Sequence, residues 1–288
     1  MLLKSHVRLY IKNNNKEEEK IMKKFLALAL SFTMVLSVAA CSSTPKEEPK
    51  DEEGQEEVVD TEGDVAVLKM GCSADFYPFE AFDDSGQNII GYDVEMMEEI
   101  CSRIGMTLEI TDMNFDSVVT AVQTGKIDVG VSGMTINEER LESVNFSEYY
   151  FVAAQSILVP LDTEITGYQA LLDGDFTASV QLGTTGDIMA SEKMEGRVNQ
   201  YEKYGDALAA LLAGKVDCMV LDTAVAEAYA EANNLMVLEE VFGTEDDTEY
   251  YGIAIAKENT DLLDAINGAL ADMKADGFFD ELNEKYFG

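Results

Sequence analysis

Histidine is almost absent from this chain of 288 residues, and cysteine is scarce. The single histidine, His6, precedes a secretion-type segment, so the rest of the chain lacks the imidazole that serine and cysteine triads and histidine-ligated metal sites need. The four cysteines form neither zinc-type pairs nor a disulfide framework for a chain of this length. We therefore expect no metal, no cofactor and no histidine-dependent catalysis.

Basic residues are also few, 20 against 56 acidic residues, which gives a formal net charge of −36. Such an imbalance argues against nucleic acid and anionic lipid as partners, because both repel a negative surface. Hydrophobic residues make up 47% of the chain and charged residues 26%, which suits a folded core rather than a disordered chain. The length allows one large domain or two small ones.

The longest apolar run, residues 25–40, has about 16 residues where a membrane span needs roughly 20. It follows Met22-Lys23-Lys24 and ends at Cys41, which is the pattern of a secretory signal. Its last three residues and the cysteine that follows, Val38-Ala39-Ala40-Cys41, resemble the bacterial lipobox, in which the cysteine is acylated and becomes the first residue. We therefore expect residues 22–40 to be a signal peptide and Cys41 to carry a lipid.

The segments on either side of this signal have different expected fates. Residues 1–21 are polar and suit no signal peptide, so we expect an untranslated leader, with translation starting at Met22. Residues 42–64 hold ten acidic residues, two lysines, two prolines and no aromatic residue. Such a composition cannot bury apolar area, so 41–64 is predicted to be a lipidated cysteine followed by a flexible acidic arm.

From residue 65 onward, short apolar runs alternate with helical periodicity. The first half predicts strands over 65–72, 107–111 and 127–131, and helices over 93–104 and 116–123. The second half predicts strands over 176–182, 216–221, 235–238 and 251–256, and helices over 187–194, 207–213, 223–232 and 261–287. This alternation indicates an α/β fold of two lobes, each a mostly parallel sheet flanked by helices, with a ligand cleft between them.

Polar and aromatic residues gather where the predicted strands end, which is where such sheets place their ligands. Arg140 can bind a carboxylate through two parallel hydrogen bonds, and the amides of Thr185 and Gly186 at a helix start suit the same group. Asp222 can pair with an ammonium, with Thr135 completing its hydrogen bonds. Together these groups suit a zwitterion.

Each of these features also has a plainer interpretation. Arg140 could be a surface charge, residues 183–187 an ordinary turn and Asp222 a helix cap. Phe76 and Phe79 could belong to the core. The functional interpretation is favoured because all of these features fall at strand ends.

Several motifs, in the same order, resemble the family 3 extracellular solute-binding proteins, which are amino-acid receptors of ABC importers with the type II periplasmic-binding fold. The resemblance covers about residues 68–288. The matching segments are Gly91-Tyr92-Asp93-Val94-Glu95-Met96, Phe76-Tyr77-Pro78-Phe79-Glu80, Gly133-Met134-Thr135 followed by Glu139-Arg140, Asn145-Phe146-Ser147, Gly183-Thr184-Thr185 and Tyr251-Gly252-Ile253.

The resemblance implies a role for each matching position. Arg140 and the amides of Thr135 and Thr185 would bind the ligand α-carboxylate. Asp222, the Thr135 hydroxyl and the Gly133 carbonyl would hold the α-ammonium. The rings of Phe76 and Phe115 would sandwich the side chain. The positions expected to tune specificity are Ser73, Asp75, Ser132, Gln181 and Leu221.

One position departs from the resemblance. Members selective for basic or amide side chains often carry an acid at the position of Ser73, where this chain has a serine. The Gly133-Met134-Thr135 segment, in contrast, resembles some arginine and lysine receptors. The expected ligand is therefore a polar or basic L-amino acid.

The expected mechanism is hinge closure around the ligand. Lobe 1 would comprise residues 65–153 plus 252–288 and lobe 2 residues 154–251, with the chain crossing near 150–154 and 249–252. The closed form would deliver the amino acid to the permease of an ABC importer. The expected protein is a monomer outside the cytoplasm, lipid-anchored to the cell membrane of a Gram-positive-type envelope.

Three other functions compete with this one. The same fold is used by dehydratases that act on prephenate-like acids, although this chain shows no catalytic carboxylate beyond those assigned to binding. A sensor input domain would need a downstream membrane segment or kinase, and none follows residue 65. An acidic surface lipoprotein without a ligand would have an undersized cleft.

Overall fold

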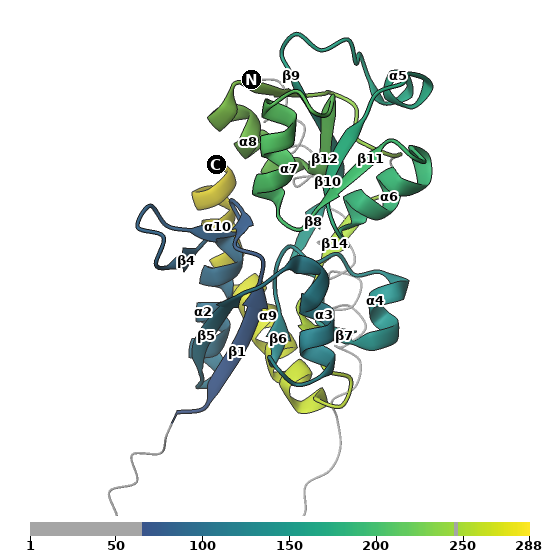
Figure 1. Cartoon of the computed structure of the whole chain (residues 1–288). Coiled ribbons are helices and arrows are strands. Elements are labelled where there is room, and N and C mark those ends of the chain that lie inside the picture. The colour runs from purple at the N-terminus through teal and green to yellow at the C-terminus, as the bar shows by residue number, and fades with distance from the viewer. Residues whose placement is uncertain (1–64, 245–246) are drawn as a thin grey trace, which may run out of the picture. The chain divides into compact units, whose positions relative to one another are not determined.

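A computed structural model describes residues 65–244 and 247–288, all within one compact unit (Figure 1). The predicted leader, signal peptide, lipidated Cys41 and acidic arm lie outside the described residues. Two five-stranded sheets dominate the described part, and helices pack on each of them. The prediction of an α/β fold with two lobes is confirmed; below, the first and second lobes are the parts built on the first and second sheets.

The first sheet has the strand order β5-β1-β6-β15-β7. Its strands are β1 (Val67–Cys72), β5 (Thr107–Asp112), β6 (Val129–Gly130), β7 (Asn145–Phe146) and β15 (Ala254–Ile255). Strand β1 runs parallel to β5 and β6, whereas β15 runs antiparallel to β6 and β7. The small antiparallel sheet β2-β3-β4 (Asp75–Phe76, Glu80–Phe82 and Ile89–Ile90) follows β1 directly.

The second sheet repeats this arrangement with the order β11-β10-β12-β9-β13. Its strands are β9 (Gln155–Pro160), β10 (Ala178–Gln181), β11 (Val198–Tyr201), β12 (Cys218–Asp222) and β13 (Leu235–Val237). Strand β10 runs parallel to β11 and β12, and β9 runs antiparallel to β12 and β13. The carboxyl ends of β10 and β12 therefore lie at one edge of this sheet.

Both sheets are mixed, which corrects the expectation of mostly parallel sheets. Each has two parallel and two antiparallel strand pairs. The reason lies in the connections: β9 and β15 come directly after β8 (Phe151–Ala153) and β14 (Glu249–Tyr251), without the crossover helix that makes a strand parallel to its neighbour. Periodicity alone does not distinguish these two kinds of connection.

Strands β8 and β14 pair with each other in a two-stranded antiparallel sheet. Its register sets Glu249 opposite Ala153 and Tyr251 opposite Phe151. These are the segments in which the two crossings between lobes were predicted, and Figure 1 shows them between the two lobes.

The predicted helices start or end within a few residues of their expected bounds, and two short helices, α4 and α5, were not predicted. The first sheet carries α2 (Tyr92–Ile104), α3 (Phe115–Gln123), α4 (Glu138–Ser143), α9 (Thr260–Asp276) and α10 (Phe278–Phe287). The second carries α5 (Tyr168–Asp173), α6 (Thr185–Lys193), α7 (Tyr204–Leu212) and α8 (Thr223–Asn233). The predicted single helix over 261–287 is two helices, broken at Gly277, whose φ is 90°.

The cores are apolar and include the cysteines. Cys72, Cys101 and Cys218 are free and buried among hydrophobic neighbours, as predicted. In the described part of the chain, no helix is long and apolar enough to cross a membrane.

Candidate functional site

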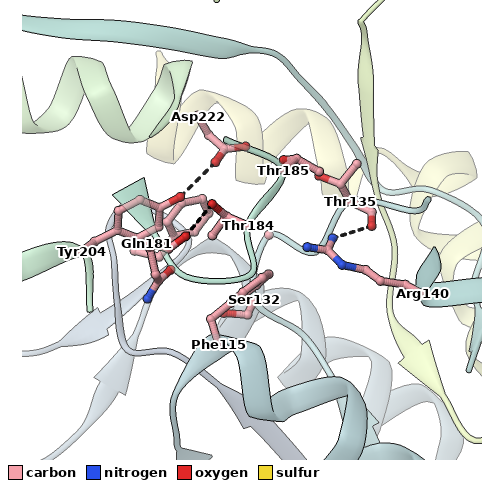
Figure 2. A pocket seen from close by; sticks show the side chains of 11 residues that line it. Phe115, Ser132, Thr135, Arg140, Gln181, Thr184, Thr185, Tyr204 and Asp222 are labelled. Atoms are coloured by element: carbon pink, nitrogen blue, oxygen red, sulfur yellow. Dashed lines mark hydrogen bonds between the residues drawn. The ribbon is translucent and has the colours of Figure 1, made fainter. Parts of the chain in front are cut away.

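A pocket opens where strand ends of the two sheets face each other (Figure 2). Its lining is formed by Phe76, Phe115, Ser132, Gly133, Thr135, Arg140, Gln181, Thr184, Thr185, Tyr204 and Asp222. All of these except Thr184 and Tyr204 are residues that the sequence predicts for the site. Segments of both lobes, from Phe76 to Asp222, thus meet in one cavity.

Arg140 is buried, with 8% of its surface exposed, so it is not the surface charge of the plainer interpretation. Its Nη1 donates to the Thr135 carbonyl (2.6 Å) and its Nη2 to the Gly183 carbonyl (3.0 Å) of the opposite lobe. The guanidinium lies 5.2 Å from the centre of the Phe115 ring. Burial lowers the pKa of Arg140, and the negative charges of Glu249 and Asp222 oppose that shift.

Helix α6 begins at the pocket wall. The Thr184 hydroxyl caps this helix by accepting from the Asp187 amide (3.1 Å) and donates to the Gln181 carbonyl (2.8 Å). Thr185 and Gly186 are the first helical residues, whose amides have no partner within a helix. Thr185 lines the pocket, whereas Gly186 packs against the Gln155 side chain, where a Cβ would meet Oε1 at 2.6 Å.

Asp222 ends β12 and its side chain makes no capping bond to α8, which removes the helix-cap interpretation. Its carboxylate accepts from the Tyr251 hydroxyl and, at 3.4 Å, from the Tyr204 hydroxyl. Burial raises the pKa of Asp222, and the hydrogen bond from Tyr251 works in the opposite direction. A buried carboxylate that faces a cavity is a strong potential partner for a cation.

Glu249, on β14, is a second buried carboxyl beside the pocket that sequence reasoning missed. It accepts from the Thr135 hydroxyl (2.9 Å) and from Gln155 Nε2 (3.2 Å). Burial and then the negative charge of Asp222 raise its pKa to about 7. Because Thr135 Oγ1 donates to Glu249, the implied contact of this hydroxyl with an ammonium would have to use its free lone pair. The predicted crossing over 249–252 was the one available signal for this residue.

The two aromatic residues expected to sandwich the ligand side chain, Phe76 and Phe115, have different surroundings. The Phe76 ring stacks on Phe79 and on Tyr204, with both ring centres 5.3 Å from its own. Tyr204 belongs to the second lobe, so this stack joins the lobes, whereas Phe115 lies under Arg140. Gly133, whose φ is 51°, lies so close to Phe76 that a Cβ would be 2.3 Å from Cε1.

Of the positions expected to tune specificity, Ser132 and Gln181 line the pocket, and Ser73 and Asp75 lie behind that wall. The Ser73 amide donates to Ser132 Oγ (3.0 Å), and Gln181 Nε2 donates to the Ser73 hydroxyl (3.2 Å). The Asp75 carboxylate accepts from Ser73 Oγ (3.0 Å) and from the Gly205 amide (3.1 Å). Leu221 is fully buried in the core and is not part of the lining.

Two buried acids stand behind the first-lobe wall. The Ser132 hydroxyl donates to Glu80, and the Gly133 amide (2.9 Å) and Tyr150 hydroxyl (2.8 Å) donate to Asp93 Oδ2. Burial raises the pKa of Asp93 to about 6, and burial together with the charge of Asp93 raises the pKa of Glu80 well above its usual range.

Among the described residues, no group of three or more His, Cys, Asp and Glu side chains could hold a metal ion. The pocket thus offers one guanidinium, helix amides, buried carboxyls and aromatic rings. The sequence profile of the bacterial extracellular solute-binding proteins, family 3, matches residues 68–288. The chain belongs to this family.

Relatives named as amino-acid-binding ABC transporter proteins extend the match along most of the chain. The arginine-binding extracellular protein ArtP of Bacillus subtilis is 30% identical and covers 92% of this chain and 98% of its own. The ABC transporter glutamine-binding protein GlnH of the same organism is 30% identical and covers 92% and 97%. At the level of the family, the role is therefore that of a binding protein for transport outside the cytoplasm.

Solved structures agree with the fold. Holo ArgBP from T. maritima is 43% identical, with a TM-score of 0.68 over 77% of this chain and 96% of its own. The ancestral amino acid-binding protein AncCDT-1, described as a precursor of cyclohexadienyl dehydratase, is 35% identical, with a TM-score of 0.72 over 77% and 96%.

Proposed function

We propose that this protein captures an α-amino acid between its lobes and delivers it to an ABC importer. The observation that carries the proposal is the pair of opposite charges in one pocket: buried Arg140 from the first lobe and buried Asp222 from the second. A zwitterionic head group needs one partner of each sign, both desolvated and hydrogen-bonded. The amino-acid ligands in the names of ArtP, GlnH and ArgBP support this assignment.

In the proposed pose, the α-carboxylate lies against Arg140 and the Thr185 and Thr135 amides. The α-ammonium lies against Asp222, with the Thr135 hydroxyl and the Gly133 carbonyl near it. Thr184 holds the α6 terminus in place, and Glu249 adds a second negative group behind Thr135. The side chain then extends past Phe115 towards Ser132 and Gln181. Figure 2 shows Gln181 and Arg140 approaching the pocket from opposite sides.

Closure of the two lobes would bury this ligand and present a joined surface to the permease. Lobe 1 comprises residues 65–153 plus 252–288 and lobe 2 residues 154–251 in this proposal, with β8 and β14 as the hinge. Contacts that cross the cleft support a closing motion, among them the Arg140–Gly183 hydrogen bond and the Phe76–Tyr204 stack.

The delivery arrangement rests on the N-terminal sequence. A lipid on Cys41 and the acidic arm would hold a monomeric receptor near its importer on the outer face of the cell membrane, at high effective concentration. Mass spectrometry of the mature protein tests this part: an acylated Cys41 as the first residue is expected, and an unmodified residue further upstream would contradict it.

A thermal-shift screen of the twenty amino acids plus ornithine and citrulline, followed by calorimetry, tests the binding function. Arg140→Ala is expected to weaken binding at least about tenfold, since a hydrogen bond to a charged group contributes about 1.5–3 kcal/mol. The matched control is Arg103→Ala, because Arg103 pairs with Glu99 and Asp276 at the surface. Equal affinity in the Arg140→Ala variant and the wild type would refute the assigned role.

The alternative function is catalysis of a dehydratase-type reaction, because AncCDT-1 is described as a precursor of a dehydratase. Asp222 and Glu249 are each held by hydroxyl donors, which suits binding of a cation. We therefore expect the ligand to be recovered unchanged after incubation with the protein. A dehydrated product from prephenate or a related acid, detected by mass spectrometry, would favour the enzyme instead.

A further inference from the structure

A lysine of the second lobe, Lys203, reaches across the cleft to the far end of the pocket. It is the N-cap residue of α7, immediately before the pocket-lining Tyr204. Its Nζ donates to Asp112 Oδ1 (2.9 Å), the Met113 carbonyl (3.1 Å) and the Ser73 hydroxyl (3.2 Å). All three acceptors belong to the first lobe, so Lys203 is an ion-pair and hydrogen-bond bridge between the lobes.

Lys203 does not line the pocket, but hydrogen bonds connect its ammonium to the lining that the ligand side chain would face. Ser73 connects the two: its amide donates to Ser132 Oγ, and its hydroxyl accepts from both Gln181 Nε2 and Lys203 Nζ. Ser132 and Gln181 both line the pocket. Ser73 is itself 1% exposed, so its hydroxyl is within the protein rather than in solvent.

We propose that Lys203 is a specificity-determining residue that selects an amino acid with an uncharged side chain, best a carboxamide, and disfavours cationic side chains. This inference rests on the proposed function and names the ligand class of the same site. Lys203 occupies Asp112, a carboxylate at this end that could otherwise pair with a cationic side chain.

The charges around Lys203 support an uncharged ligand rather than an anionic one. Asp112 forms an ion pair with Lys203, and Asp75 accepts from Ser73 and from the Gly205 amide. The cation is therefore already neutralised and has little attraction left for a second carboxylate. A guanidinium or ammonium finds no free carboxylate here either, because Asp112 is paired with Lys203 and Asp75 already accepts two hydrogen bonds, so the desolvation of the ligand's charge would go uncompensated.

A carboxamide matches the groups that remain. The amide nitrogen of Gln181 is taken up by Ser73 and by the Glu202 carbonyl (3.1 Å), so the Gln181 side chain offers its oxygen as an acceptor. A carboxamide can donate to such an oxygen and accept from a hydroxyl, and it carries no net charge that would need a free partner at this end of the pocket. This selection follows a general rule of specific sites, in which the preferred ligand finds matching hydrogen-bond partners and the competing ligand is left with an unpaired charge.

Calorimetric titration of the full mature protein with glutamine, asparagine, arginine and lysine tests the proposal. Wild-type protein is expected to bind glutamine or asparagine at least about tenfold more tightly than arginine or lysine. Lys203→Met, which keeps the stem and removes the charge, is expected to narrow this ratio about tenfold or more. Lys203→Arg keeps a cation and should keep the ratio, as should the control Lys215→Met at an exposed lysine of the same lobe.

A ratio of affinities separates selection from general destabilisation, because loss of the lobe bridge alone would weaken all four ligands alike. Tighter binding of arginine or lysine by the wild type would overturn the proposal, and so would an unchanged ratio in Lys203→Met. Neither of those results would contradict the proposed capture of an amino acid. Failure of every amino acid in the wider screen to bind would instead overturn the proposed function.

Discussion

Glu249 makes ligand binding pH-dependent in a direction that the structure determines. Its pKa is raised to about 7 by burial and by Asp222, so near pH 6.5 most molecules without ligand carry a proton there. An α-ammonium placed against Asp222 favours the ionised carboxylate, and the pKa of Glu249 then falls. The liganded protein thus holds fewer protons, and affinity rises as pH rises through the range between the two pKa values.

The size of the change in affinity with pH follows from how far the ligand lowers the pKa of Glu249. If the ligand lowers the pKa of Glu249 from about 7 to about 5, affinity increases roughly 20-fold between pH 5.5 and pH 8. The same shift releases about 0.7 proton per ligand at pH 6.5. That shift of two pKa units corresponds to about 2.7 kcal/mol of interaction between ligand and carboxylate.

Calorimetry in two buffers of different ionisation enthalpy, at pH 6.5, measures this proton release directly. Glu249→Gln keeps the shape and can still accept from Thr135, so it should bind with a flatter pH profile and release fewer protons. The control Glu258→Gln changes an exposed glutamate and should leave the pH profile of binding and the proton release unchanged. Equal heats in the two buffers, together with constant affinity from pH 5.5 to pH 8, would refute the reasoning.

Two further predictions concern the wall behind the pocket. The pKa of Asp93 is about 6 in the folded protein and near 3.8 in the unfolded chain, so the folded state binds this proton more tightly. The contribution of Asp93 to the free energy of unfolding therefore falls by up to about 3 kcal/mol as pH rises from about 4 to 6. Asp93→Asn should gain stability relative to wild type over that range in denaturant titrations; a gain equal to that of the exposed control Asp84→Asn would contradict this. Gly133→Ala should cost about 2–4 kcal/mol and weaken ligand binding, because its Cβ would meet Phe76 at a φ of 51°, whereas Gly86→Ala, at a φ of 68° with open space around it, should cost about 1–2 kcal/mol. Equal losses in these two alanine variants, by the same denaturant titrations, would show that the contact with Phe76 carries no weight.

Local sequence signals predicted the elements that have strong periodicity of their own. The apolar face of α2 and its Gly105 terminus were visible in the sequence, as were β1 and the strand end at Asp222. Short elements without such a pattern were missed, including α4, α5 and the two-residue strand β7, whereas β6 was predicted but is shorter than the expected strand over 127–131. Their conformation depends on partners in the sheet, so no window of the sequence contains the cause.

The site shows the same division. Arg140, Asp222 and the α6 start could be identified because guanidinium, carboxylate and helix amides have a known chemical use at strand ends. Tyr204, Glu249 and Lys203 could not, because each reaches the pocket through the pairing of distant segments: Lys203 meets Asp112 across 91 residues and Thr135 meets Glu249 across 114. Nothing in the immediate neighbourhood of these residues marks them as functional.

The sequence by itself determined which chemical groups this protein can bring to a ligand: a guanidinium, carboxylates, helix amides and aromatic rings, without histidine. It also determined that strands and helices alternate, because that pattern is local. Only the tertiary structure decided which acids are buried, which hydroxyls already have partners and where the positive charge of Lys203 stands. Desolvation and the distances between charges set pKa values and selectivity, and both arise only when the two lobes come together.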